Sequence, residues 1–566
     1  MVTGARTFSL EDTFLSPQIL DPPPTRHALL AFLLALAAIL HIGTAAWGDL
    51  YDGIEGEVAG GAREMLQTRQ WLRPTNDGIP ALRTPPFSYW VVALSCKIFG
   101  VTTTAARIPV ALAMIGSVAL TFLIGERLAD YWRGFAAGLI HLCSIGGFLF
   151  GRIVSPGPFA ALFVSGAIYC AVCGYQHRKF RRVWFGAFAL STALACLSTG
   201  LHAIFYPAGI CVLLSILYRE ARMRFRPILH WSNLLLCIAV IVPWYLWAHL
   251  HFPAFLSQLI ARPLAFGDRH LLGWAVAGCF PALFLILPAL LVVPRKILRP
   301  DEFTAADALP LIWIAMTLIG IAFIGERDIG AAALVLPGFA LFAASAWERI
   351  SPGLRTFGII LVFVAGVVAW GLVGFAPGVL DQVANRQFPD WVWVSMQPLA
   401  HITLVALVIF SAAALVVVTK QRGEIVLLLA LGAMVPVGFC LTEARSRVTS
   451  FYSLADAAQY LNPRIGAGGS VVFEGTPHEG SSLGLYLEKK FFLLNQQPSI
   501  FERDPESQAK YLDERLVLEA WERSSPIYLI IDERRVSYWR KSITERVHIF
   551  HQVSTCGSRI ILSNQL

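Results

Sequence analysis

Four carboxylates follow the first long apolar run of the chain: Asp49, Asp52, Glu55 and Glu57. Carboxylates beside a bilayer are costly unless they are solvated, paired or used in chemistry. One of them could accept a proton as a general base, and we favour Glu55 over Asp52 for that role. The structural alternative is that each acid caps the following helix or pairs with Arg63.

The rest of the chain has the composition of a membrane protein. Of its 566 residues, 56% are hydrophobic and 14% are charged, whereas a soluble domain carries about 25% charged residues. The first 442 residues hold 30 basic and 22 acidic side chains, and the last 124 hold 15 of each. The net charge of +8 thus lies in the apolar body. Basic residues in the loops, which orient membrane helices, explain this positive charge. We therefore expect no nucleic-acid partner.

About thirteen stretches are long and apolar enough to cross a bilayer, which takes about 20 helical residues. They run over 28–48, 106–126, 134–150, 158–176, 183–199, 201–218, 228–249, 272–293, 307–325, 329–347, 355–376, 397–418 and 424–441. Segment 86–99 is short, and we expect it to be interfacial or re-entrant. The sequence therefore predicts a cytoplasmic leader (1–27) and an all-α polytopic body (28–442).

Loop charge predicts the orientation of these helices. If residue 1 is cytoplasmic and 86–99 does not span, each basic cluster faces the cytoplasm, as the positive-inside rule requires. These clusters lie near 127–133, 178–182, 219–226, 295–299, 349–355 and 420–422. The outer side then holds loops 49–105, 250–271 and 377–396, together with the tail.

The tail, 443–566, is predicted to be a small soluble α/β domain. Short strands are expected at 470–473, 527–531, 548–553 and 559–562, because these runs are rich in apolar and β-branched residues. Helical spacing is present at 502–523 and 533–546.

The loop from 49 to 105 carries a sequence pattern that extends beyond its acids. The pattern consists of Arg63-Glu64-Met65, Trp71-Leu72, Pro74, Pro85-Pro86, Tyr89-Trp90, Phe99-Gly100, Ala106-Arg107 and Pro109. It resembles the GT-C class of glycosyltransferases that use lipid-linked sugars, in particular the bacterial aminoarabinose transferases to lipid A and the related protein O-mannosyltransferases. Aligned on the Arg-Glu-Met, the second acid of that family's pair falls on Glu55. The tail stretch 481–487 is similar to the family's Ser-Leu-x-Phe-Tyr-Leu.

The chain departs from this family at several positions. Ile54 stands where the first acid of the pair is expected, and Arg83 with Thr84 replaces a Glu-Lys. Gly157 replaces an Asp, and Thr199 occupies the position of a Lys. These departures motivate the alternative that the chain is a non-catalytic relative that binds a lipid-linked sugar.

The resemblance implies a GT-C fold and transfer of a sugar from a polyprenyl-phosphate donor to a glycolipid or protein acceptor, with inversion. Glu55 or Asp52 would be the base, and cations would bind the leaving phosphate. The candidate phosphate ligands are Arg83, Arg152, Arg262, Arg269 and His270. Each basic residue could instead be an interfacial side chain that reaches lipid headgroups. If the base and the phosphate ligands belong to one active site, they must lie together around one outward-facing cavity.

The resemblance also implies a bacterial inner membrane, a lipid environment and a periplasmic tail. We expect no cofactor, and a metal ion held by His249, His251 and His270 is a minor alternative, since i, i+2 spacing does not place two ligands on one helix face. A lipid transporter or flippase is a further alternative. It predicts ionisable residues near the bilayer midplane, whereas most charges here lie at the ends of spans.

Overall fold

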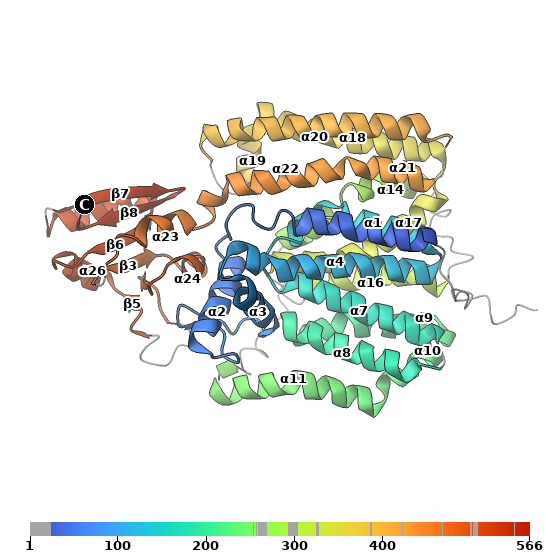
Figure 1. Cartoon of the computed structure of the whole chain (residues 1–566), viewed down its shortest axis with the longest axis horizontal. Coiled ribbons are helices and arrows are strands. Elements are labelled where there is room, and N and C mark those ends of the chain that lie inside the picture. The colour runs from blue at the N-terminus through green and yellow to red at the C-terminus, as the bar shows by residue number, and fades with distance from the viewer. Residues whose placement is uncertain are drawn as a thin grey trace, which may run out of the picture.

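The computed structural model shows a bundle of long helices with a smaller α/β region at one end (Figure 1). It describes residues 24–177, 179–252, 254–255, 257, 269–292, 304–323, 328–384, 388–420, 423–466, 468–498, 501, 508–547 and 549–565. Most of the predicted leader and Arg262 lie outside these ranges, and Arg269 is described by its backbone alone.

Long apolar helices form the body of the molecule. Within the described residues, nine helices or continuous helix pairs are long and apolar enough to cross a membrane. They are α4 (Thr103–Leu128), α7 (Gly157–Gln176), α8 (Arg181–Thr199), α11 (Trp231–His251), α16 (Ala305–Phe323), η4 with α17 (Ile329–Arg349), α18 (Pro352–Phe375), α20 (Asp390–Val417) and α21 with α22 (Gly423–Arg447).

The other predicted spans appear as shorter or interrupted helices. α13 and α14 meet at 89°, and α5 is separated from α6 at Ser144, whose hydroxyl caps α6 by accepting a hydrogen bond from the Gly147 backbone N–H at 2.9 Å. These helices are α1 (Pro24–His41), α5 (Tyr131–Leu142), α6 (Ile145–Phe150), α9 (Phe205–Leu217), α13 (Arg269–Ala277) and α14 (Ala282–Val292), and α10 (Arg219–Phe225) and α19 (Pro377–Ala384) are short connections. Each predicted range is thus largely helical where it is described.

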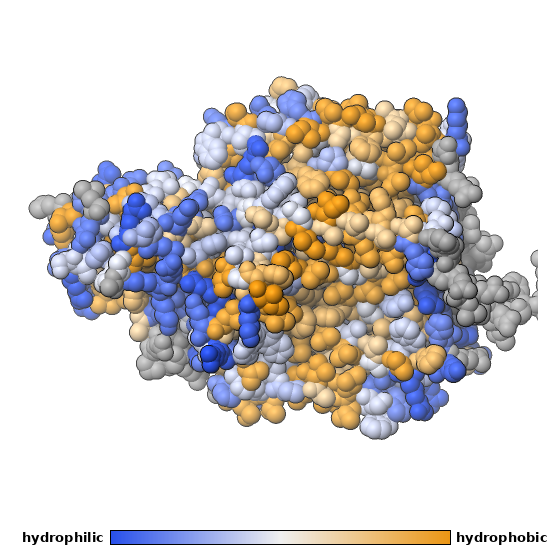
Figure 2. Space-filling model, viewed as in Figure 1, coloured by the Kyte–Doolittle hydropathy of each residue, from blue (hydrophilic) through white to orange (hydrophobic). Residues whose placement is uncertain are grey.

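The surface of the helical body is apolar around its middle. In Figure 2 a broad hydrophobic band covers the bundle, and hydrophilic residues collect at its two ends and over the α/β region. α18 and α20 expose large apolar side chains, including Val368 at 56% and Val405 at 56%. Because a surface of this kind is unfavourable in water, the chain is a multi-span membrane protein.

A thin layer lies between the bundle and the α/β region (Figure 1). It contains α2 (Ile54–Thr68), the hairpin of β1 (Thr75–Asn76) and β2 (Ile79–Pro80), and α3 (Phe87–Phe99). α3 packs on α2 and α4, and its 13 residues are too few to cross a hydrocarbon core of about 30 Å. This length agrees with the prediction of an interfacial or re-entrant segment at 86–99.

The chain after α22 folds around a six-stranded sheet with the strand order β5-β4-β3-β6-β8-β7. Parallel pairing joins β5, β4, β3 and β6, and β8 runs antiparallel to both β6 and β7. The strands are β3 (Ser470–Glu474), β4 (Phe492–Leu494), β5 (Tyr511–Leu512), β6 (Ile527–Asp532), β7 (His551–Cys556) and β8 (Arg559–Ser563). The helices are α23 (Ala455–Leu461), α24 (Leu483–Tyr486), α26 (Glu514–Trp521) and α27 (Val536–Thr544).

The expected small α/β fold of the tail is confirmed, with two local corrections. The predicted helix over 502–523 contains strand β5 and the shorter helix α26, because Tyr511 and Leu512 extend the parallel sheet by pairing with β4. The strand expected at 548–553 lies at His551–Cys556 instead, where it pairs with β8. Pairing between strands, which local apolar patterning does not encode, decides both positions.

Candidate active site

The predicted carboxylates lie where the chain enters α2. Gly53 precedes the helix with a φ of 94°, a backbone conformation that glycine adopts at little cost. Asp52 and Glu55 line one large cavity, whereas Glu57 lines a second cavity. Positions 55 and 57 of a helix point in different directions, so α2 separates the two cavities.

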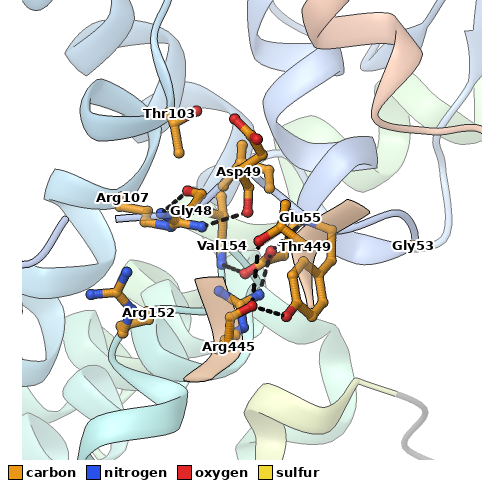
Figure 3. Close-up of polar contacts among 12 residues, drawn as sticks. Gly48, Asp49, Gly53, Glu55, Thr103, Arg107, Arg152, Val154, Arg445 and Thr449 are labelled. Carbon is orange, nitrogen blue, oxygen red and sulfur yellow. Dashed lines mark hydrogen bonds and ion pairs between the residues drawn. The ribbon is translucent and has the colours of Figure 1, made fainter. Parts of the chain in front are cut away.

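Glu55 is almost completely buried, with 2% of its surface exposed. One carboxylate oxygen accepts hydrogen bonds from the Tyr51 backbone N–H at 2.8 Å and from the Arg445 guanidinium at 2.7 Å. The other accepts from the Val154 backbone N–H at 3.2 Å (Figure 3). Burial opposes ionisation, but the positive charges of Arg445 and Arg107 outweigh it and hold the pKa of Glu55 below its ordinary value. Glu55 is therefore an ionised carboxylate held by three donors.

Three arginines lie around this carboxylate (Figure 3). Arg445 comes from the end of α22, and its guanidinium carbon lies 3.9 Å from the centre of the Tyr51 ring. Arg107 and Arg152 are buried, with 1% and 3% of their surface exposed. They donate to the chain just before α2, Arg107 to the carbonyl oxygens of Ala45, Trp47, Gly48 and Asp49, and Arg152 to Thr44 and to the carbonyl oxygen of Trp47. The two side chains fix the loop that carries the acids.

Asp52 has a different environment from that of Glu55. Its Oδ1 accepts a hydrogen bond from the Ser482 backbone N–H at 2.9 Å, and its own backbone N–H donates to the Tyr452 carbonyl oxygen at 2.6 Å. Burial raises the pKa of Asp52 to about 7, and the hydrogen bonds from Ser482 offset only part of that rise. A carboxyl group with a pKa near neutrality can take up and release a proton at physiological pH.

A loop of the C-terminal region completes the turn around Asp52. The Ser481 hydroxyl accepts from the Gly53 backbone N–H at 2.8 Å and donates to the Gly53 carbonyl oxygen at 2.9 Å. A Cβ atom on Gly56 would lie 2.5 Å from the Ser482 backbone nitrogen. Arg63 donates to three carbonyl oxygens of the following turn of this loop. The expected alternative in which Arg63 pairs with an acid is wrong, because backbone carbonyls occupy its guanidinium.

The cavity lined by Asp52 and Glu55 has a volume of about 1420 Å³. Its walls come mainly from apolar side chains of α6, α13, α14, α18, α20 and α22, and its polar end carries Tyr51, Asp52, Glu55 and Arg445. This volume exceeds the range of about 300–1,000 Å³ that is usual for small-molecule sites. The volume and the lining fit a molecule with a long apolar chain and a polar head.

The predicted phosphate ligands do not gather in this cavity. Arg83 lines the second cavity, on the other side of α2, and Arg152 donates to the loop before α2. His270 is exposed at the start of α13, and Arg262 lies outside the described residues. Sequence reasoning missed Arg445, because a basic residue at the end of an apolar span also fits a simple interfacial anchor.

The histidines that were considered for a metal do not form a cluster in the structure. In the part of the chain that is described, no group of three or more His, Cys, Asp or Glu side chains is placed to hold a metal ion. His251 Nδ1 lies 2.9 Å from the Trp247 carbonyl oxygen, one turn earlier in the same helix. The candidate site is built from carboxylate and guanidinium groups.

Comparisons with known proteins agree with this architecture. Residues 83–247 match the family model described as dolichyl-phosphate-mannose-protein mannosyltransferase. An uncharacterised protein of Aquifex aeolicus is 28% identical over 235 residues, which cover 40% of this chain and 46% of that protein. An undecaprenyl phosphate-alpha-4-amino-4-deoxy-L-arabinose arabinosyl transferase of Pseudomonas fluorescens (strain Pf0-1) is 27% identical over 276 residues, 45% of this chain and 47% of that protein. The chain thus spans about half the length of these curated relatives.

Solved structures share the fold over nearly the whole chain. ArnT from Cupriavidus metallidurans, in a crystal structure bound to undecaprenyl phosphate, superposes with a TM-score of 0.78 at 18% identity, over 95% of this chain and 98% of ArnT. The archaeal oligosaccharyltransferase AglB from Archaeoglobus fulgidus gives a TM-score of 0.50 at 12% identity, over 95% and 74%. The chain is a polytopic membrane protein that has the fold of ArnT. In sequence it is similar to the arabinosyl transferases and to the protein-mannosyltransferase model.

Proposed function

We propose that the protein is an integral-membrane glycosyltransferase that moves a sugar from a polyprenyl-phosphate donor to an extracytoplasmic acceptor, either a glycolipid or a protein. The observation that carries this proposal is the large apolar cavity whose polar end holds Asp52, Glu55 and Arg445. It can take a long isoprenoid chain and present the attached phosphate to charged groups. The shared fold with ArnT, which was solved with undecaprenyl phosphate, supports the same donor class.

The proposed reaction is a single displacement with inversion at the anomeric carbon. The acceptor hydroxyl oxygen forms the new bond to this carbon, and the bond from the carbon to the phosphate oxygen breaks. A carboxylate takes the hydroxyl proton, and the polyprenyl phosphate leaves with the bonding electrons. The raised pKa of Asp52 and the ion pair that holds Glu55 favour Asp52 as the base. Glu55 then acts by positioning Arg445.

The charge that develops on the leaving phosphate requires nearby cations. Arg445 lines the polar end of the first cavity and is our first candidate, since a guanidinium can donate two hydrogen bonds to a phosphate. Arg83, Arg269 and His270 remain candidates from the sequence, as does Arg262 in the loop that is not described. We further propose a bacterial inner-membrane location with residue 1 in the cytoplasm and the α/β region in the periplasm.

The test is release of polyprenyl phosphate from labelled polyprenyl-phosphate sugars by the purified protein in nanodiscs. We expect Asp52→Asn to abolish release and Glu55→Gln to reduce it, with Glu64→Gln, in the same helix, as the control that stays active. If Asp52→Asn retains full activity and Glu55→Gln is inactive, Glu55 is the base.

The alternatives predict different outcomes of this assay. One alternative is a non-catalytic relative, because Ile54 replaces the first acid of the family's pair. Such a protein would bind the donor without releasing polyprenyl phosphate. A flippase would move the intact donor between the leaflets of a proteoliposome. Either outcome would contradict the transferase proposal.

A further inference from the structure

We propose that the end of the helical body opposite the α/β region binds the headgroups of anionic phospholipids. The surface consists of the loop between α7 and α8 together with α10 and the short 3₁₀ helix η2 (Arg226–Leu229), which connect α9 to α11. We call it the basic surface. It lies at the far end of the bundle from α2 (Figure 1), so it takes no part in the proposed transfer reaction.

The basic surface carries a large surplus of positive charge. Between residues 179 and 231 the sequence holds one lysine, six arginines and one acid, Glu220, which leaves a surplus of six positive charges. The basic side chains are Lys179, Arg181, Arg182, Arg219, Arg222, Arg224 and Arg226. Most of them are arginines, whose planar guanidinium can donate two parallel hydrogen bonds to a phosphate. A phosphate group is therefore a ligand that fits this composition.

Two segments that are separated in the sequence by α8 and α9 meet in this surface. α10 packs on α7, and η2 packs on α8. The Arg224 guanidinium donates to the Tyr175 carbonyl oxygen at 3.0 Å, and its carbon lies 4.7 Å from the centre of the Tyr175 ring. The fold thereby brings the arginines of α10 to the same corner of the bundle as the basic loop after α7.

Several other basic side chains at this end of the bundle are paired with acids. Arginines of α1, α5 and α17 form ion pairs between helices: Arg26–Glu126, Arg133–Glu348 and Arg349–Asp307. On the basic surface, Glu220 pairs with Arg224 at 2.7 Å.

Three arginines of the basic surface have no such partner. Among the described residues, no acid lies within ion-pair distance of Arg182, Arg219 or Arg226. The positive-inside rule accounts for basic loops in general, but the lack of acidic partners distinguishes this corner from the rest of the same end. Anions from outside the chain would relieve the repulsion among these charges.

Exposed apolar side chains alternate with these basic residues. Phe180, Leu229 and Trp231 expose 58%, 84% and 69% of their surface. Large apolar side chains are unfavourable in water, whereas basic, aromatic and aliphatic residues together are typical of segments at the headgroup level of a bilayer. An acidic protein or a nucleic acid would match the charge alone. A phospholipid with an anionic headgroup matches both the charge and the apolar side chains.

The first test measures lipid retention by native mass spectrometry. The full-length protein, in a non-ionic detergent, is titrated with dioleoyl-phosphatidylglycerol and separately with dioleoyl-phosphatidylcholine. We expect phosphatidylglycerol to bind about tenfold more tightly or better, since each basic residue near an anionic lipid surface contributes about fivefold. Equal affinity for the two lipids would overturn the proposal.

Variants that remove charge then locate the binding. A triple variant, Arg182→Gln with Arg219→Gln and Arg226→Gln, removes three exposed side chains, and it should weaken phosphatidylglycerol binding about tenfold or more. Lysine at the same three positions keeps the charge and should retain most of the affinity. Unchanged binding by the glutamine variant would refute the site.

The matched control removes the same charge from the α/β region. Arg523→Gln, Arg534→Gln and Arg546→Gln together change three exposed arginines and should leave phosphatidylglycerol binding as in the wild type. A loss as large as that of the first triple variant would show that net charge, and not the basic surface, holds the lipid. That result would also refute the site.

A different partner and the proposed function are tested separately. A short single-stranded RNA, titrated under the same conditions, should not bind; RNA binding that the glutamine variant abolishes, without a preference for phosphatidylglycerol, would make this a nucleic-acid surface instead. Polyprenyl-phosphate release is measured in parallel and should be the same in the glutamine variant and the wild type. A protein that retains phosphatidylglycerol and releases no polyprenyl phosphate would refute the transferase and leave the lipid surface in place.

Discussion

Two carboxylates three positions apart differ in protonation because their partners differ. Glu55 is held by Arg445 and by two backbone N–H groups, which stabilise the charged form. Asp52 is partly buried and receives its hydrogen bonds from Ser482, so its charged form is less stable. Neighbouring acids whose pKa values are pushed apart are a common way to separate a base from an electrostatic group.

The pH dependence of activity should follow Asp52. A base works in its deprotonated form, so kcat/KM should rise about tenfold per pH unit below a pKa of about 7 and level off above it. Polyprenyl-phosphate release, measured between pH 5 and 9, tests this rise. A flat profile over this range would assign the base to a carboxylate with an ordinary pKa.

The same group should make stability depend on pH. The pKa of Asp52 is about 7 in the folded protein against an ordinary 3.8, so between these values the folded state holds a proton that the unfolded chain has lost. The contribution of Asp52 therefore lowers the unfolding free energy as pH rises from about 4 to 7, by up to about 4 kcal/mol. Asp52→Asn should remove this slope, as measured by thermal unfolding in detergent. An identical slope in the variant would show that the pKa is not raised.

Breaking the ion pair between Glu55 and Arg445 should destabilise the fold strongly. Glu55→Gln leaves the Arg445 guanidinium, which is 14% exposed, without its counter-charge, and we expect a loss of about 3–5 kcal/mol. Arg445→Met in the same background should recover part of this loss, because no charge is then left unpaired. A double-mutant cycle followed by unfolding measures the coupling, and additive losses would show that the two groups act independently.

At the scale of elements, helix α2 is the part that the site depends on most. It separates the two cavities, and its first turn packs against Ser481 and Ser482 of the C-terminal region. Sequence reasoning placed an acid-bearing helix here, with Glu55 or Asp52 as the base and with caps or pairing to Arg63 as the structural alternative. The structure shows a glycine before the helix with no side-chain cap, because the C-terminal loop supplies the groups that bond to this turn.

A methyl group on Gly56 should loosen this contact. Gly56→Ala would place a Cβ atom 2.5 Å from the Ser482 backbone nitrogen and 2.6 Å from the Ser481 hydroxyl oxygen. We expect faster hydrogen exchange over 476–486 and at least a tenfold loss of activity, because Asp52 loses its fixed partner. Gly186→Ala is the control, since nothing lies within 4 Å of a Cβ atom there. Unchanged exchange over 476–486 in Gly56→Ala would mean that the loop yields at little cost.

At the scale of the whole molecule, the apolar band in Figure 2 separates two polar ends. One end carries the α/β region together with α2 and α3 (Figure 1). The distribution of basic loops predicts that this end faces away from the cytoplasm. The acids of α2 that line the two cavities then lie on the side where the proposed reaction would use a lipid-linked sugar.

This orientation can be measured directly. A single reactive cysteine introduced at Leu516 of α26, which is 41% exposed, should react with a membrane-impermeant maleimide in cells whose outer membrane is permeabilised. A cysteine introduced at Met223 of α10, 62% exposed, should react only after the inner membrane is broken, in a background where the native cysteines stay unlabelled. The opposite pattern would invert the topology and place the proposed site in the cytoplasm.

The sequence by itself determined the membrane body, the approximate helix positions, the small α/β tail and the acids near residue 52. These features depend on local composition and hydropathy, which can be read from each segment of the sequence alone. Only the tertiary structure decided which groups meet. It pairs Glu55 with Arg445, 390 positions away, and the Ser482 backbone N–H donates a hydrogen bond to Asp52. It also places Arg83 in the second cavity, on the other side of α2 from Asp52. Such contacts arise when distant segments pack together, and the hydropathy of either segment does not encode its partner.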